Sequence, residues 1–438
     1  MNIGDCKKPD AIMKYNILVV VFLVLTLLLG CSPKAPVTVP PTQEAPVASE
    51  TPVPTPVMPT APITPSPSTT ASQPTLPSPS IPPSTTTPPT PTRPLPPLDA
   101  FMKGFFFADW APLTQPPAGA PPFSGLYAPP ETDMSLKNLA ATGTNWIGLN
   151  VVCEQATIAS TTIVRAPPRT ASDAELLRII NLAHSLGMRV MLRPQVSLAD
   201  YPAHWSGDIG SAFTSEAQWQ EWFTSYREFI NHYASFSQEA GADMLCLGVE
   251  MGGVTHREQD WRRIIQEVRE RYKGPLTYSS LASIGGNYLD GEGKRIKWWD
   301  AVDYIGTTGY YPLTDKNDPT VAELKAAWTG RGYIALLENL SKKFNKPIIF
   351  TEIGYESKDG TNRMPASGQT AGTLDFQEQA DCYQATLEVM LDKSWFRGIF
   401  WFQWLANTRF PGSSPTGTGF MPWGKPAEEV LKRFYLSQ

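Results

Sequence analysis

The sequence feature that most constrains the fold is a regular alternation of short apolar runs with longer amphipathic segments, from residue 99 to residue 438. Runs of five to eight residues that are rich in apolar and β-branched residues are typical of buried strands. The runs span residues 104–108, 145–152, 189–194, 243–249, 276–280, 303–309, 347–351 and 398–404.

The segments between these runs are typical of helices. In 172–187, Ser172 is suited to cap a helix and Gly187 to terminate it. The segments 257–272 and 375–393 repeat their apolar residues at helical spacing along one face.

Strands that alternate with helices predict a parallel sheet, because parallel neighbours need a crossover connection. Eight such units in the 340 residues from Asp99 predict an α/β fold, a (β/α)8 TIM barrel enlarged by loops. The alternative is a doubly wound open sheet, but no Gly-x-Gly-x-x-Gly follows the first predicted strand. Active sites of such barrels lie at the C-terminal ends of the strands.

The N-terminus predicts export. The apolar run 17–29 is shorter than the roughly 20 residues that span a bilayer. Lys14 precedes it, and Cys31 follows it in Leu-Leu-Gly-Cys. This arrangement resembles a bacterial lipoprotein signal, which implies lipidation at Cys31. The signal would also be complete if translation started at Met13. A plain N-terminal membrane anchor is the alternative. In both cases we expect an extracytoplasmic protein held at a membrane, at the cell surface or in the periplasm.

Residues 32–98 predict a linker. Positions 32–97 contain 23 prolines in 66 residues, with no glycine and no aromatic residue. Such a composition cannot build a core and favours extended polyproline geometry. We therefore expect a disordered stalk, with a proline-rich ligand for a partner domain as the alternative.

Charge and cysteine content exclude several classes of protein. The net charge of −5 argues against a nucleic-acid partner. The four histidines lack metal-ligand spacing, so we expect no metal and no other cofactor. Three cysteines of the barrel region form no disulfide framework. We expect them to be buried free thiols in a monomer: Cys153, Cys246 and Cys382.

Two glutamates mark a candidate active site. Glu250 ends the fourth predicted strand and Glu352 ends the seventh, so a closed barrel brings both to one mouth. Two carboxylates in one pocket suit glycoside hydrolysis, with one as the proton donor and the other ionised. A separation of about 5–5.5 Å would predict retention of anomeric configuration. The alternative is that each glutamate pairs with a basic residue at the rim.

The motifs resemble clan A of the glycoside hydrolases and, within it, family 113, the β-mannanase family. The resemblance covers 101–430 and is most specific in "TEIGY" and "DYIG…YYPL", with support from "FMKGFFFADW" and "LGVEMGG". It implies Glu250 as general acid/base, Glu352 as nucleophile and a β-1,4-linked mannan or related hexose polysaccharide as substrate. The clan usually places Asn before the acid/base to bind the sugar 2-hydroxyl, whereas this chain has Val249.

The resemblance also implies that Tyr310, after the sixth strand, hydrogen-bonds the nucleophile, with Tyr311 as the competitor. Trp404, at the end of the eighth strand, is a candidate platform for a sugar ring.

Three further residues lie at strand ends that face the predicted mouth. Arg193 could stabilise a carboxylate there, and a rim salt bridge is its alternative. Trp110 and Gln155 follow the first and second strands and are candidate substrate contacts, whereas Asn150 could point either way.

These observations predict a retaining glycoside hydrolase that acts by double displacement. A β-1,4-glucanase of the same clan is the alternative enzyme, because Val249 cannot make the usual contact with the sugar 2-hydroxyl. A non-catalytic carbohydrate-binding surface lipoprotein is the alternative from another class; Val249 favours it and the glutamate pair opposes it.

Overall fold

The computed structural model describes residues 94–110, 126–201, 203–283, 286–366, 372–407 and 414–437. The predicted lipoprotein signal, the lipidation site Cys31 and nearly all of the predicted linker lie outside these residues. Within the described residues, no helix is both long enough and apolar enough to cross a membrane.

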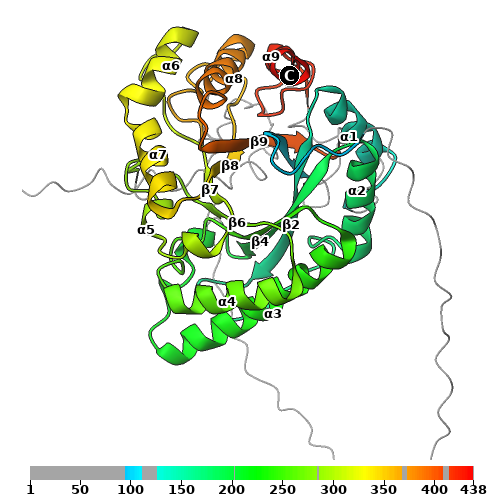
Figure 1. Cartoon of the computed structure of the whole chain (residues 1–438), viewed down its shortest axis with the longest axis vertical. Helices are drawn as coiled ribbons and strands as arrows, with labels where there is room; N and C mark the ends of the chain where they lie inside the picture. Colours follow the sequence, from blue (N-terminus) through cyan, green and yellow to red (C-terminus); the bar gives the residue numbers. More distant parts are fainter. Residues whose placement is uncertain are drawn as a thin grey trace, which may run out of the picture. The chain divides into compact units, whose positions relative to one another are not determined.

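Eight parallel strands form a closed barrel (Figure 1), with the order β1-β9-β8-β7-β6-β5-β4-β2 and a pairing of β1 with β2 that closes it. A ninth strand, β3 (Ile163–Val164), pairs antiparallel with the end of β2. Each of the eight predicted runs supplies one barrel strand, so the predicted TIM barrel is confirmed. The barrel strands are β1 (Met102–Ala108), β2 (Trp146–Gln155), β4 (Arg189–Leu198), β5 (Met244–Val249), β6 (Leu276–Ser280), β7 (Ile305–Thr308), β8 (Ile348–Ile353) and β9 (Phe396–Leu405).

Helices surround the strands (Figure 1). The predicted cap of α2 is present: the Ser172 side chain accepts from the backbone N–H of Glu175, and Glu175 reciprocates. The helices are α1 (Glu131–Ala141), α2 (Asp173–Ser185), α3 (Glu216–Ala240), α4 (Glu258–Arg271), α5 (Glu292–Arg295), α6 (Val321–Gly330), α7 (Tyr333–Phe344), α8 (Phe376–Met390) and α9 (Pro426–Leu436).

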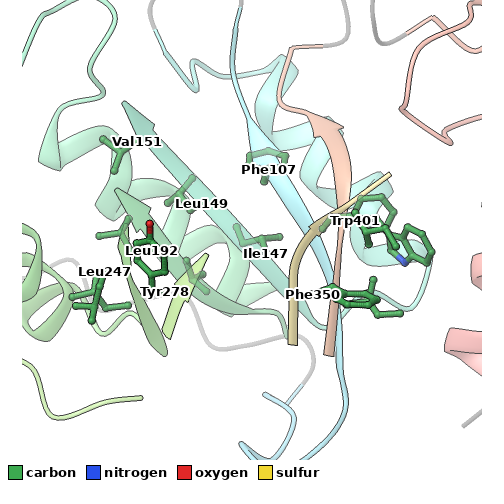
Figure 2. Close-up of a cluster of buried hydrophobic side chains, with 14 of the residues drawn as sticks. Phe107, Ile147, Leu149, Val151, Leu192, Leu247, Tyr278, Phe350 and Trp401 are labelled. Atoms are coloured by element: carbon green, nitrogen blue, oxygen red, sulfur yellow. The ribbon is translucent and has the colours of Figure 1, made fainter. Parts of the chain in front are cut away.

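The main core lies between the outer face of the barrel and the helices. Figure 2 shows part of it, including Ile147, Leu149 and Val151 of β2, which alternate along the strand. Their neighbours point into the barrel, because successive side chains of a strand face opposite sides. The alternation therefore separates a helix-facing side of each strand from a barrel-facing side.

The interior of the barrel is filled in layers. One cluster of buried side chains comprises Met102, Trp146, Met191, Met244, Cys246, Val249, Ile349 and Phe400. Another comprises Phe106, Ala108, Tyr310, Phe402 and Phe420. The barrel is thus a packed core, and polar side chains at the C-terminal strand ends lie over an apolar floor.

A β-bulge interrupts β9 near its end. Phe105 of β1 pairs with Trp401, but Phe107 pairs with Trp404, so three residue steps on β9 oppose two on β1. The extra residue breaks the alternation of side chains along β9. The three cysteines of the barrel are buried and free, as predicted.

Candidate active site

Glu250 lies directly after β5, where the chain turns sharply. Its φ is +50°, a left-handed conformation that is costly for a residue with a side chain, by about 1–3 kcal/mol. Its backbone N–H donates to the Ser279 carbonyl of β6 at 2.8 Å, which holds the turn. The side chain is only 5% exposed.

Glu352 lies in β8, one residue before the end of the strand, and is 4% exposed. Two side chains from other barrel strands bind its carboxylate: Arg193 lies in the middle of β4, and Tyr310 follows the end of β7. Arg193 Nη2 donates to Oε2 at 2.6 Å, and the Tyr310 hydroxyl donates to Oε1 at 2.8 Å. Both carboxylate oxygens are therefore held by donors, as an oriented nucleophile requires.

The two glutamates differ in their electrostatic environment. Burial, followed by the negative charge of Glu352, raises the pKa of the Glu250 carboxyl to about 8. A hydrogen bond with the Thr308 hydroxyl and the charge of Arg193 oppose this rise in pKa. At neutral pH Glu250 is therefore protonated, whereas Glu352 forms an ion pair with Arg193. This is the division of roles that two-carboxylate hydrolysis needs.

Arg193 reaches Glu352 from β4, across the barrel mouth. Its guanidinium lies over the Phe106 ring, 4.7 Å from the ring centroid, and Nη1 is 3.4 Å from Asn150 Oδ1. The side chain is buried, and cation–π contact is most favourable when the cation is desolvated. Arg193 therefore contacts a carboxylate in the mouth, and a contact of Arg193 with substrate stays a prediction.

Tyr310 makes the hydrogen bond to Glu352 that was expected of it. Tyr311 points the other way and packs against Tyr333 and Trp328 on the helix side. The sequence did not decide which of the two tyrosines hydrogen-bonds Glu352, and the structure shows that Tyr310 does.

Trp110 lies beside the mouth and is half-buried. Its ring stacks on Phe106 at 6.1 Å between centroids, and its indole N–H donates to Gln403 Oε1 at 2.7 Å. Because Phe106 also contacts Arg193, Trp110 and Gln403 belong to the same cluster as the glutamates. A sugar contact by Trp110 stays a prediction.

Trp404 is not a sugar platform, and this prediction is wrong. Its ring is fully buried on the helix side of the barrel, where it packs edge-on against Phe105. Its indole N–H donates to the backbone carbonyl of Ser135 at 3.1 Å and to the Ser135 hydroxyl at 3.0 Å. The bulge in β9 is the physical reason, because it shifts the alternation and turns Trp404 away from the barrel interior.

Gln155 is not a substrate contact either. Its amide is fully buried, with Oε1 accepting from the Trp222 indole at 2.8 Å and Nε2 donating to the Thr157 carbonyl at 2.8 Å. Gln155 follows Ile147 by an even number of residues on β2, and Ile147 faces the helices. Alternation from Ile147 would have predicted this orientation.

Sequence reasoning missed Gln403 and Thr308. Thr308 ends β7 and opposes the rise in the pKa of Glu250, and its position at a strand end was a usable signal. Gln403 lies beside the bulge of β9, where no pattern in "GIFWFQW" marks the extra residue.

Three buried polar atoms of the site have no hydrogen-bond partner among the described residues. They are Glu250 Oε1, Arg193 Nε and Gln403 Nε2. Buried polar atoms are rarely left without partners, and such a group in a pocket points to water or a polar ligand. Two donors and a carboxyl suit a hydroxyl-rich molecule. In the described part of the chain, no three His, Cys, Asp or Glu side chains gather in a metal-binding arrangement.

The barrel and its carboxyl pair define a class of protein. A (β/α)8 barrel with a protonated glutamate after its fourth barrel strand and an ion-paired glutamate on its seventh has the arrangement of a glycoside hydrolase. The family model of Glycoside Hydrolase Family 113 matches residues 118–425, so the chain belongs to glycoside hydrolase family 113.

Solved structures of this family are similar in fold. A structure of a family 113 β-1,4-mannanase is 29% identical, covers 77% of this chain and 100% of its own, and has a TM-score of 0.65. The family 113 β-mannanase AaManA from Alicyclobacillus acidocaldarius, solved in complex with ManMIm, is 28% identical over 77% of this chain and 98% of its own, with a TM-score of 0.64. No curated protein matches the chain.

Proposed function

We propose that this chain is a retaining β-mannanase that hydrolyses β-1,4-linked mannan by double displacement. The observation that carries the proposal is the unequal pair of glutamates: Glu250 is protonated by burial, and Glu352 is ion-paired with Arg193. The mannan assignment is supported by two similar solved structures of family 113 that are described as β-1,4-mannanases.

In the first step, the Glu352 carboxylate attacks the anomeric carbon and the glycosidic C–O bond breaks. Glu250 gives its proton to the departing oxygen, which leaves as an alcohol. In the second step, Glu250, now ionised, takes a proton from water as the water oxygen attacks the anomeric carbon and releases Glu352. Two inversions retain the configuration.

Tyr310 and Arg193 orient Glu352 in both steps. Trp110 and Gln403 supply sugar contacts at the adjacent wall, and Gln403 Nε2 offers a donor to a hydroxyl. No such donor comes from Val249, whose side chain belongs to the apolar cluster inside the barrel.

The test compares release of reducing ends from mannan and from carboxymethyl cellulose. We expect cleavage of mannan, with NMR showing the β-anomer as the first product. Glu352→Ala should abolish this activity, and azide should restore turnover of an aryl glycoside as a glycosyl azide. Wild-type activity in Glu352→Ala would refute the mechanism.

One observation favours a second candidate, a β-1,4-glucanase. Val249 removes the usual contact to the 2-hydroxyl, and mannose and glucose differ at that carbon. Cleavage of carboxymethyl cellulose alone would select this candidate.

We also propose that the enzyme is an extracytoplasmic lipoprotein tethered through Cys31 and the proline-rich linker. The apolar run 17–29 before Leu-Leu-Gly-Cys supports this proposal. Metabolic labelling with a palmitate analogue should mark the wild type and not Cys31→Ala. Labelling of both proteins would contradict it.

A further inference from the structure

A further buried carboxyl group, Glu292, lies beside the segment that follows Glu250. Glu292 begins α5, is 1% exposed and takes no part in the steps above. Its Oε2 accepts from the Leu281 backbone N–H at 2.7 Å, and its Oε1 accepts from the Tyr278 hydroxyl at 2.7 Å. A buried carboxylate is costly unless such donors satisfy it, so this one is built into a network.

Tyr278 links Glu292 to the chain beside Glu250. It lies on β6, facing the helices in the core cluster of Figure 2. Its hydroxyl accepts from the Met251 backbone N–H at 2.8 Å while it donates to Glu292. The hydrogen bonds therefore run in one direction, from Met251 through Tyr278 to Glu292, and each strengthens the next.

Met251, whose amide Tyr278 binds, lies at a turn with a strained backbone. Glu250 has a left-handed backbone, and Met251 is the next residue. The amides of both residues bind β6: the Glu250 N–H binds the Ser279 carbonyl, and the Met251 N–H binds the Tyr278 hydroxyl. The two bonds together define the turn from which the Glu250 side chain projects.

Glu292 also lies close to this turn. A Cβ atom at Gly252 would lie 3.8 Å from the Glu292 carboxyl carbon. The charge of Glu292 adds to the rise in the pKa of Glu250, after the larger effects of burial and Glu352. The two carboxyl groups are therefore close enough to interact.

We propose that Glu292 and Tyr278 are positioning residues that act through the Met251 amide to hold Glu250 in line with the departing glycosidic oxygen. The proposal rests on the function of Glu250 as the proton donor. It predicts a defect confined to reactions that need that proton.

The experiment measures kcat/KM for Tyr278→Phe and Glu292→Gln on two substrates. A manno-oligosaccharide has a poor leaving group and needs a proton, whereas a 2,4-dinitrophenyl β-manno-oligosaccharide does not. We expect a loss of about 10-fold to 100-fold on the first, smaller than the 10²–10⁴-fold typical of general acid catalysis. On the second we expect about 3-fold or less, because kcat/KM reports its first step, which needs no general acid.

Two matched variants control for stability. The Tyr272 hydroxyl donates to the Ala242 carbonyl at 2.7 Å at the opposite end of the strands, so Tyr272→Phe loses a comparable buried hydrogen bond. Glu378 is a buried acid of α8 that accepts from the backbone N–H groups of Asn362 and Gly360. Tyr272→Phe and Glu378→Gln should lower the melting temperature and leave the ratio of the two kcat/KM values unchanged.

Equal losses on both substrates, or no loss in either folded variant, would overturn the positioning role. Circular dichroism confirms that each variant is folded, and Glu292→Gln tests the proposal if Tyr278→Phe does not fold. A wild-type protein without activity on either substrate would instead refute the proposed function itself.

Discussion

Arg193 and Glu352 form an ion pair inside the mouth of the barrel, with Nη2 and Oε2 2.6 Å apart and side chains 1% and 5% exposed. Breaking a buried pair by removing one partner leaves a buried charge uncompensated, at a cost of about 3–5 kcal/mol. Arg193→Met should therefore lower the free energy of unfolding by that order, and kcat by at least about 100-fold. Chemical denaturation and steady-state kinetics measure the two effects.

A second arginine of β4 forms an ion pair that serves as a control, because it lets the effects on stability and on catalysis be measured separately. Arg189 begins β4 and pairs with Asp243 at the opposite end of the barrel. Arg189→Met should destabilise the protein and leave kcat close to that of the wild type. A similar loss of kcat in both variants would show that Arg193 acts only through stability.

Tyr310→Phe removes the hydroxyl that donates to Glu352 Oε1. A hydrogen bond to a charged group contributes about 1.5–3 kcal/mol, so kcat should fall roughly 10-fold to 100-fold. Tyr311→Phe is the matched control, because the Tyr311 ring packs on the helix side. Stopped-flow or steady-state kinetics on an aryl mannoside distinguishes the two, and an equal effect would assign no special role to Tyr310.

The strands were predictable because each barrel strand carries a distinct apolar run, and the position of both glutamates followed from the rule that parallel strands end at one mouth. The hydrogen bonds of Glu352 were predictable only in part. Arg193 lies within β4 and Tyr310 follows β7, but the choice of Tyr310 over Tyr311 depends on how the chain leaves β7. An alternation argument would also have excluded Gln155, which shares the helix-facing side of β2 with Ile147.

Trp404 shows where local patterns stop being informative. A bulge inserts one residue into β9, and nothing in the apolar run distinguishes that insertion from a regular strand. The insertion is a tertiary feature, set by how β9 pairs with β1. It turns Trp404 toward Ser135 of α1, and Gln403 instead contacts Trp110.

Trp404→Phe tests this correction. It removes the indole donor to Ser135 from a buried site, which should lower the free energy of unfolding by about 1–3 kcal/mol. The KM for mannan should stay within about 2-fold of the wild type, because the Trp404 ring is buried on the helix side and does not face the sugar site. A loss of about 1.4 kcal/mol in binding would raise the constant tenfold. A large increase in KM would restore Trp404 as a platform.

Trp110 and Gln403 should behave in the opposite way. Gln403→Leu removes both the acceptor for the Trp110 indole and the unpartnered Nε2 donor. We expect the KM for manno-oligosaccharides to rise about 10-fold, since a site that loses a hydrogen bond to a substrate hydroxyl loses about 1–2 kcal/mol. Isothermal titration calorimetry measures the affinity directly when Glu352→Ala is compared with the double variant Glu352→Ala/Gln403→Leu, because neither protein hydrolyses the ligand. An unchanged affinity would remove Gln403 from the sugar site.

The raised pKa of Glu250 connects activity and stability to pH. The carboxyl must be protonated to donate, so wild-type kcat/KM on unactivated substrates should fall as pH rises through about 8. The folded protein also binds this proton more tightly than the unfolded chain, whose carboxyl has an ordinary pKa of 4.5. The contribution of Glu250 to stability is therefore fully present below about pH 4.5 and is lost as pH rises through about 8.

Glu250→Gln carries no ionisable group at this position and cannot lose that contribution. Relative to wild type, it should gain stability between pH 5 and pH 9 by an amount on the order of a few kcal/mol, since one pKa unit corresponds to about 1.4 kcal/mol. Thermal unfolding of both proteins at the two pH values measures the difference, and the comparison at pH 5 serves as the internal control. A constant difference across the range would mean that Glu250 titrates alike in the folded and unfolded protein, and the assignment of Glu250 as the proton donor would then lose its electrostatic basis.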